Sequence, residues 1–404
     1  MDGLAEIFER ALADVGAPGG VVAVVGDDVD VCVARGITNA ATRIAVTADT
    51  LFLSGSTQKV ATAYALMSLV DDGYVALDTP VCEVLSDFDA AITLRHLLAH
   101  TSGVDGDLFF LDTGRGDDAL ARYASACSDL EALFAPGELV SYCNAGYAIA
   151  GRMAEVTAGK TYEDVVRERV FESMGLRSVL FPEDALLRSA AVGHFPSKAG
   201  PRPVDQWGTL RAMGPAGSTM ATTAADLALF GLRASERGDM QEPQSSRDPR
   251  TPARGIGWAL VDHGGVRVLS HDGFNGGQCA SLRVVPERRA AVAVMVNYAR
   301  GPMVAAPTID YVFRQLGVPE ATMPAEATNG AEAHDGVYER RGVRFEVDGL
   351  LVTQTDGRRP NTMKLRPAEG GVFLMELPVF GDVVASFVED RYFSAQGRVA
   401  KRVS

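Results

Sequence analysis

The tetrapeptide Ser56-Thr57-Gln58-Lys59 opens a segment that is apolar nearly all round. Residues 60–70 read Val-Ala-Thr-Ala-Tyr-Ala-Leu-Met-Ser-Leu-Val and hold no charged side chain. A helix without a polar face has to be surrounded by other elements, so we expect a central buried helix here. Ser56 and Lys59 are spaced i, i+3, which brings two side chains together on one face of a helix. The chain must therefore fold around a helix that carries a serine and a lysine at its start.

A serine and a lysine at this spacing can perform acyl transfer. The serine hydroxyl is a weak nucleophile until a base removes its proton, and a lysine held neutral can act as that base. This S-x-x-K arrangement is used by serine acyl-transfer enzymes. The alternative is structural, because serine is also a favoured helix N-cap. Only five of the 38 basic residues are lysines, which makes Lys59 notable.

Two later stretches could supply the other groups of such a site. Tyr142 and Asn144 lie two residues apart, just before a helical pattern at 145–158. A phenol can act as acid or base, and an amide can bind a lysine amine or a substrate carbonyl. In Ser270–Gly277, strand alternation points His271 and Gly273 to one side. The glycine would let a substrate approach the backbone closely.

The motifs S-x-x-K, Y-x-N and H-x-G, in this order, resemble those of the serine β-lactamase-like superfamily. The resemblance is to its class C, esterase and D-aminopeptidase branch (peptidase S12-like). It extends to Thr93–Gly103, a T-L-R-H-L-L-x-H-T-S-G string, and to Gly214–Thr219 before a helix. It covers roughly residues 5–316. The small tail beyond it is similar to the lipocalin-like domain of some relatives.

The resemblance implies a role for each motif residue. Ser56 would be the acylated nucleophile, and Lys59 and Tyr142 would share the general base and acid work. Asn144 would bind the substrate amide or orient Lys59; its other reading is a turn or cap residue.

The resemblance also implies roles on the later strand. His271 would stand where relatives carry a lysine or histidine beside the site, although a strand histidine is often structural. The backbone N–H groups of Ser56 and Phe274 would form the oxyanion hole. Gly273 and Phe274 are thus expected among the substrate-binding residues.

We expect no metal and no cofactor. His96 and His100 have the spacing of a zinc-binding H-E-x-x-H motif, but Leu97 stands where the glutamate should be. We therefore interpret both histidines as structural. The five cysteines are scattered and form no C-x-x-C, which favours free thiols in a reducing compartment.

The hydrophobic pattern predicts an α+β fold: an antiparallel sheet flanked by helices, with an α-rich subdomain over about residues 60–250. We expect a β-lactamase-like catalytic domain at 1–317, a linker at 318–335 and a small all-β domain at 336–404. Helices are expected at 4–15, 60–70, 117–134, 145–158, 161–174 and 303–316, and strands at 21–25, 29–34, 255–262, 265–270, 278–286 and 290–298.

The formal charge of −14 argues against nucleic acid or an anionic membrane as a partner, because both select basic patches. The N-terminus Met1-Asp2-Gly3-Leu4 has no basic region followed by an apolar run, and no segment has the length of a membrane span. We therefore expect a cytoplasmic location.

The expected function is a serine hydrolase or acyltransferase that attacks a small-molecule ester or amide through an acyl-enzyme on Ser56, with a second acyl acceptor as an option. A cytoplasmic location favours an esterase or transacylase. The alternatives are a D-amino-acid peptidase or amidase, a β-lactamase, and a catalytically silent ligand-binding protein on the same fold.

Overall fold

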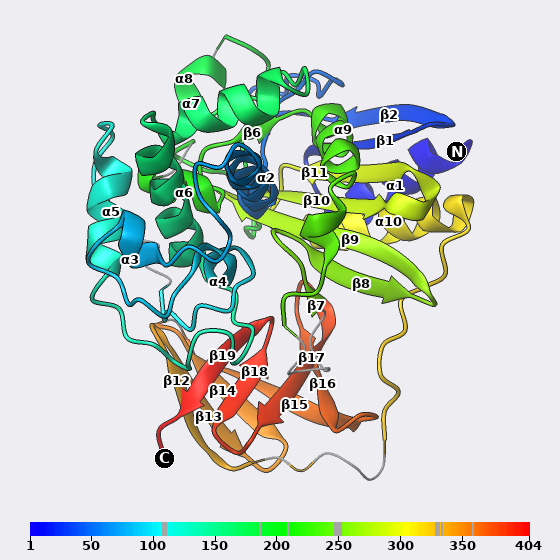
Figure 1. Ribbon diagram of the computed structural model, residues 1–404. Helices are drawn as coiled ribbons and strands as arrows, with labels where there is room; N and C mark the ends of the chain where they lie inside the picture. The colour runs from blue at the N-terminus through cyan, green and yellow to red at the C-terminus, as the bar shows by residue number, and fades with distance from the viewer. Residues whose placement is uncertain are drawn as a thin grey trace.

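The computed structural model describes residues 1–106, 111–185, 187–207, 210–245, 253–327, 332, 334–357 and 359–404. Its centre is a seven-stranded antiparallel sheet, as the sequence predicts, with the order β2-β1-β11-β10-β9-β8-β7. The N-terminal hairpin therefore pairs with β11, about 270 residues later in the chain (Figure 1). The strands are β1 (Gly19–Gly26), β2 (Val29–Gly36), β7 (Ala253–Arg254), β8 (Ala259–His263), β9 (Val266–Asn275), β10 (Gln278–Val285) and β11 (Ala290–Val296).

Helices cover both faces of this sheet. Alternate residues of β1 and β11 pack on one face against α1 (Leu4–Val15) and α10 (Pro302–Leu316). The other alternate residues join the core of α2 (Gln58–Asp71) and α9 (Ala224–Ala234). This two-sided burial explains why β1 and β11 are nearly continuously apolar. Helix α2 is surrounded by other elements, as its apolar sequence predicts.

An α-rich region lies beside the sheet (Figure 1). The expected helix over 117–134 is wrong beyond its first half, since α5 ends at Cys127. The apolar residues Leu133 and Phe134, which extended the helical pattern, pack instead against Tyr392 and Val399 of the C-terminal region. The helices here are α3 (Val81–Val84), α4 (Leu94–Leu98), α5 (Ala119–Cys127), α6 (Asn144–Ala158), α7 (Tyr162–Val166) continued by the π-turn η2 (Arg167–Glu172), and α8 (Pro182–Ala185).

Short elements link these layers. A 3-10 turn, η1 (Gly55–Thr57), leads into α2, and β3 (Phe52–Leu53) before it pairs with β6 (Ala221–Thr222). The remaining pieces are β4 (His194–Phe195), β5 (Arg202–Pro203), η3 (Arg211–Ala216), η4 (Gly238–Gln241) and η5 (Pro286–Arg288). In the described part of the chain, no helix is both long and apolar enough to span a bilayer.

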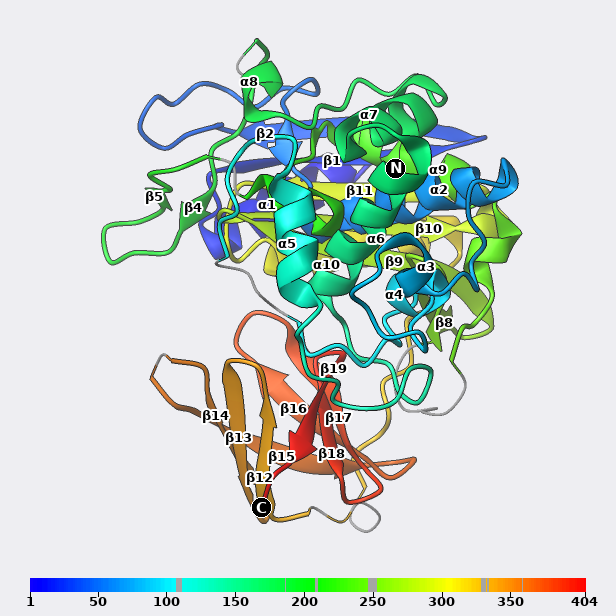
Figure 2. The ribbon, with the colours of Figure 1, turned by 60° about the vertical axis from the view of Figure 1, so that its left-hand side comes forward.

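The C-terminal strands close into an eight-stranded antiparallel barrel, because β12 pairs with β19. Aromatic side chains such as Tyr338, Phe387 and Phe393 fill its interior. Figures 1 and 2 show the barrel below the α/β part. The barrel strands β17 and β19 each have one end directed toward the α/β part. Its strands are β12 (Gly336–Arg340), β13 (Val343–Asp348), β14 (Leu351–Thr355), β15 (Asn361–Ala368), β16 (Val372–Leu377), β17 (Gly381–Val388), β18 (Tyr392–Ala395) and β19 (Arg398–Arg402).

Candidate active site

Ser56 and Lys59 lie together at the start of α2. Ser56 belongs to the η1 turn, which leads directly into α2, and Gly55 before it has a positive φ of 54°. The Lys59 ammonium donates to Ser56 Oγ at 3.1 Å and to the carbonyl of Ala216. Lys59 is fully buried, so the loss of water around its charge is offset by these close contacts.

The segment after η3 fixes the Ser56 turn from the other side. Gly217 has a φ of 119°, and a Cβ atom there would lie 2.7 Å from Ser56 Cα. Gln58, inside the S-x-x-K motif, anchors this segment because its Oε1 accepts from the Met220 N–H at 2.9 Å and the Thr219 N–H at 3.3 Å. Its amide nitrogen donates to the hydroxyl of Tyr162 at 3.3 Å. Gln58, the second of the two middle residues of the motif, is therefore structural.

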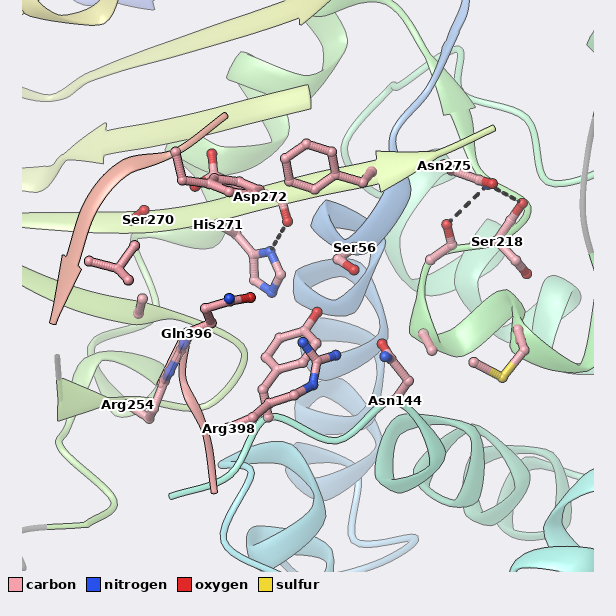
Figure 3. Close-up of a pocket in the computed structure, with 18 of the residues that line it drawn as sticks. Ser56, Asn144, Ser218, Arg254, Ser270, His271, Asp272, Asn275, Gln396 and Arg398 are labelled. Carbon is pink, nitrogen blue, oxygen red and sulfur yellow. Dashed lines mark hydrogen bonds between the residues drawn. The ribbon is translucent and has the colours of Figure 1, made fainter. Parts of the chain in front are cut away.

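Tyr142 and Asn144 flank the beginning of α6. The backbone turns at Cys143, whose Sγ accepts from the Gly146 N–H at 3.3 Å and so caps the helix. The ring centre of Tyr142 lies 4.8 Å from Lys59 Nζ, and Asn144 is buried at the cavity wall. In Figure 3 the Asn144 amide points from the helix start into the cavity toward Ser56. The two motifs predicted to share one cleft do so.

The ring of His100 packs against the ring of Tyr142. His100 has a positive φ of 60°, and its ring centre lies 4.3 Å from that of Tyr142. Its Nδ1 accepts from the Cys143 N–H at 3.1 Å. Burial, with the nearby Arg254 and Lys59 charges, holds the pKa of His100 well below its usual value, so the ring is neutral. His96 serves elsewhere, in the capping box of α4.

Strand β9 presents an open edge at the cavity. Strand β8 pairs with it only as far as Ser270, so among the described residues no strand pairs with 271–275 on that side. The two-residue turns at 264–265 and 276–277 determine which residues of β9 direct their backbone hydrogen-bonding groups toward each neighbouring strand. This is because the two residues that flank such a turn exchange hydrogen bonds. It follows that Asp272 and Phe274 direct their N–H and C=O groups outward at this edge.

Gly273 explains why β9 can lie against the nucleophile. A Cβ atom at this position would lie 2.0 Å from the Ser54 carbonyl oxygen and 2.9 Å from Ser56 N. The backbone that lies close to Gly273 is thus the Ser54–Ser56 turn, whereas the sequence predicted a close approach by the substrate. This contact also brings the N–H groups of Ser56 and Phe274 near each other, as an oxyanion hole requires.

His271 is neutral, and its Nε2 atom is an unprotonated hydrogen-bond acceptor. Its Nδ1 lies 3.0 Å from the Asp272 carbonyl, which can only accept, so Nδ1 carries the proton. Its Nε2 is buried and has no hydrogen-bond partner among the described residues. Burial, with the Lys59 and Arg254 charges, lowers the pKa of His271 to about 3. His271 therefore offers an acceptor, rather than a positive charge.

The candidate site opens on a cavity of about 640 Å³. Of the motif residues, Ser56, Tyr142, Asn144, His271 and Phe274 line it, and the sheet supplies further walls (Figure 3). The barrel contributes as well, which the sequence analysis did not predict. The additional lining residues are Leu210, Met213, Ala216, Gly217, Ser218, Arg254, Ala259, Ser270, Asp272, Asn275, Leu377, Phe380, Val383, Gln396 and Arg398.

Two arginines near Tyr142 also escaped prediction. Arg254 and Arg398 have their guanidinium carbons 6.0 Å and 4.9 Å from its ring centre. They come from strands about 110 and 250 residues away from Tyr142 in the chain. Neither carries a sequence motif; the one available signal was the glycine of Gln396-Gly397, next to Arg398, because glycine favours a turn.

Residues 4–316 match the family model described as Beta-lactamase. The chain belongs to the β-lactamase family. Its members are serine hydrolases, and the expected fold, with a C-terminal β unit beyond the family region, is confirmed.

Two proteins with similar sequences and one with a similar structure show which members of the family this chain resembles. The chain is 36% identical to "Penicillin-binding protein 4" of Amycolatopsis lactamdurans, over 83% of this chain and 97% of that protein. It is 30% identical to a "D-aminopeptidase" of Brucella anthropi, over 70% of this chain, but spans only 57% of that protein. The crystal structure of SurE is similar over 100% of this chain and 99% of its own, with a TM-score of 0.80 and 23% identity. That likeness includes the barrel.

Proposed function

We propose that the chain is a serine acyl hydrolase or acyltransferase that forms an acyl-enzyme on Ser56. The observation that carries this proposal is the 3.1 Å contact between Lys59 Nζ and Ser56 Oγ, beside the Tyr142 ring and at the floor of a 640 Å³ cavity. A nucleophile with a base in reach and oxyanion donors opposite is what acyl transfer needs.

In the acylation step, the Ser56 hydroxyl gives its proton to the Lys59 and Tyr142 pair, in which the Tyr142 phenolate beside the Lys59 ammonium is the acceptor, while Oγ bonds to the carbonyl carbon. The oxyanion is held by the N–H groups of Ser56 and Phe274. Its collapse breaks the bond to the leaving oxygen or nitrogen, which takes the proton back. Water or an amine then attacks the ester, and Ser56 regains its proton.

The cavity favours a peptide-like substrate. The outward N–H and C=O groups of Asp272 and Phe274 can pair with an extended peptide backbone, as a strand adds to a sheet edge. Arg254 makes no ion pair with a carboxylate among the described residues, and burial lowers its pKa. A carboxylate on the substrate would satisfy this charge, because guanidinium binds carboxylates in a bidentate manner.

Within this chemistry we favour an esterase or transacylase. The bare Nε2 of His271 can accept the N–H or O–H of an incoming nucleophile, which suits transfer to an amine as well as hydrolysis. A second candidate is a D-amino-acid peptidase or amidase, which the similarity to the D-aminopeptidase of Brucella anthropi supports. Arg254 and Arg398 oppose the free ammonium group that an aminopeptidase substrate would bring into the cavity.

Intact-mass spectrometry tests the acyl-enzyme directly. Wild-type protein is mixed with a p-nitrophenyl ester of an N-acylated amino acid and, separately, with a penicillin, then quenched in acid. We expect an adduct of the acyl mass on wild type and none on Ser56→Ala. Lys59→Ala and Tyr142→Phe should fold but acylate at least a hundredfold more slowly, by analogy with the loss of a general base.

A catalytically silent ligand-binding protein predicts a different result. No adduct on the wild type, or an equal adduct on Ser56→Ala, would remove the enzyme proposal. Ester turnover in the presence and absence of added D- and L-amino acid amides then separates transfer from hydrolysis, since transfer gives a new amide product.

A further inference from the structure

The barrel reaches the candidate site through one tight turn. Ala395 and Arg398 pair across a two-residue turn formed by Gln396 and Gly397, whose φ values are 56° and 71°. Two positive φ values in succession are typical of the hairpin turns that match strand twist. Figure 3 shows Gln396 and Arg398 extending from this turn into the cavity near His271.

This turn holds the segment that carries Tyr142. The Tyr142 N–H donates to the Gly397 carbonyl at 2.8 Å, and the Val399 N–H donates to Ser141 Oγ at 3.1 Å. Behind the turn, Val399 packs in an apolar cluster with Leu139. The backbone just before α6 is thus fixed by the barrel as well as by His100.

The turn also brings a cation over the Tyr142 ring. The guanidinium carbon of Arg398 lies 4.9 Å from the ring centre, almost the same distance as the 4.8 Å to Lys59 Nζ. Among the residues that the structure describes, the titratable or charged groups around Tyr142 include Lys59 from α2, His100 after α4, Tyr147 from α6, Arg254 from β7, His271 from β9 and Arg398 from β19.

Most of the charge in this set is positive. His100 and His271 are neutral, because burial, with the neighbouring cations, lowers the pKa of each. Burial likewise raises the pKa of Tyr147, which stays protonated and donates to the Leu98 carbonyl at 2.8 Å. The carboxylate of Asp272 is turned to Arg283, with contacts of 2.9 and 3.0 Å. Three of the groups named here are cations, Lys59, Arg254 and Arg398, and a nearby positive charge stabilises the deprotonated form of a phenol.

We propose that the barrel is a working part of the active site: its β18–β19 turn positions Tyr142, and Arg398 favours the phenolate form of Tyr142 that accepts the Ser56 proton. This proposal rests on the proposed function, in which Tyr142 is part of the base. Arg398 acts here through Tyr142 and is therefore a positioning residue.

The pH dependence of acylation in the full-length protein tests this role. The donor is p-nitrophenyl butyrate, which has no charge for Arg398 to bind. We expect Arg398→Gln to move the acid limb of the acylation rate about one pH unit upward and to slow acylation about tenfold below the inflection, the size expected for losing one partly solvated unit charge at this distance. Arg398→Lys keeps the charge and should stay close to wild type.

Two controls complete the experiment. Arg344→Gln removes a barrel arginine that pairs with Glu339 and Glu346 instead, and its profile should match wild type. Thermal unfolding of each variant confirms that it is folded. Ser56→Ala and Tyr142→Phe show whether the proposed function itself holds.

The proposal fails if Arg398→Gln keeps the wild-type acid limb while Ser56→Ala and Tyr142→Phe are inactive. It also fails if Arg398→Lys is displaced as far as Arg398→Gln, since charge would then not be the cause. A change in KM alone, with the limb unmoved, would indicate that Arg398 contacts substrate instead.

Discussion

Replacing Gly273 by alanine should separate the nucleophile from strand β9. The new Cβ atom would lie 2.0 Å from the Ser54 carbonyl oxygen, whereas real Cβ contacts are essentially never under 3.0 Å. The two backbones must therefore move apart by at least about 1 Å, and a shift of this size at a reacting group can cost about a hundredfold in rate.

Neither backbone can yield easily. The Ser54 carbonyl accepts from Thr57 Oγ1 at 2.9 Å, and the Ser54 N–H donates to the Met220 carbonyl at 2.9 Å. On the other side, Gly273 is held by its pairing with Ala280 of β10. We expect Gly273→Ala to lower the free energy of unfolding by about 1–3 kcal/mol, the usual cost of overpacking.

The assay is pre-steady-state acylation by a p-nitrophenyl ester, together with urea unfolding. Gly238→Ala is the control, because its new Cβ meets nothing within 4 Å and the residue has no positive φ. Acylation by Gly273→Ala at the wild-type rate would refute the view that this contact places Ser56.

Three further predictions concern separate features of the site. Gln58→Ala leaves the buried Met220 and Thr219 N–H groups without their acceptor; we expect urea unfolding to show a loss of about 2–5 kcal/mol, and acylation to slow because the Gly217 segment loosens. The folded-state pKa values of His271 and His100 are lowered, so the unfolded chain binds more protons at acid pH; stability should be intact above pH about 6.5 and fall as the pH is lowered from there toward 3, by up to about 1.4 kcal/mol per pH unit for each histidine. Replacing His271 by glutamine should reduce that slope in urea titrations, and an unchanged slope would contradict the assignment. Arg254→Gln should raise KM about tenfold for ester donors bearing a carboxylate and leave uncharged donors unaffected; an equal effect on both donors would argue against a carboxylate site.

Local sequence patterns determined the central helix, the Ser56–Lys59 pair and the fold class of this protein. The unbroken apolar run after Lys59 required a central buried helix, because a helix without a polar face has no place at a surface. The i, i+3 spacing placed Ser56 and Lys59 together, and the strand and helix patterns gave the antiparallel sheet. The motif order was sufficient to identify the superfamily, since each motif depends on residues within one turn or one strand.

The tertiary structure decided what the sequence patterns left open. Whether residues 128–134 continued a helix depended on the barrel that Leu133 and Phe134 meet. The protonation of His271 depends on its burial among cations from other elements. The positions of Arg254 and Arg398 depend on two distant strands meeting at Tyr142. Such contacts join residues that are one hundred or more positions apart in the chain. They form only when the whole chain has folded.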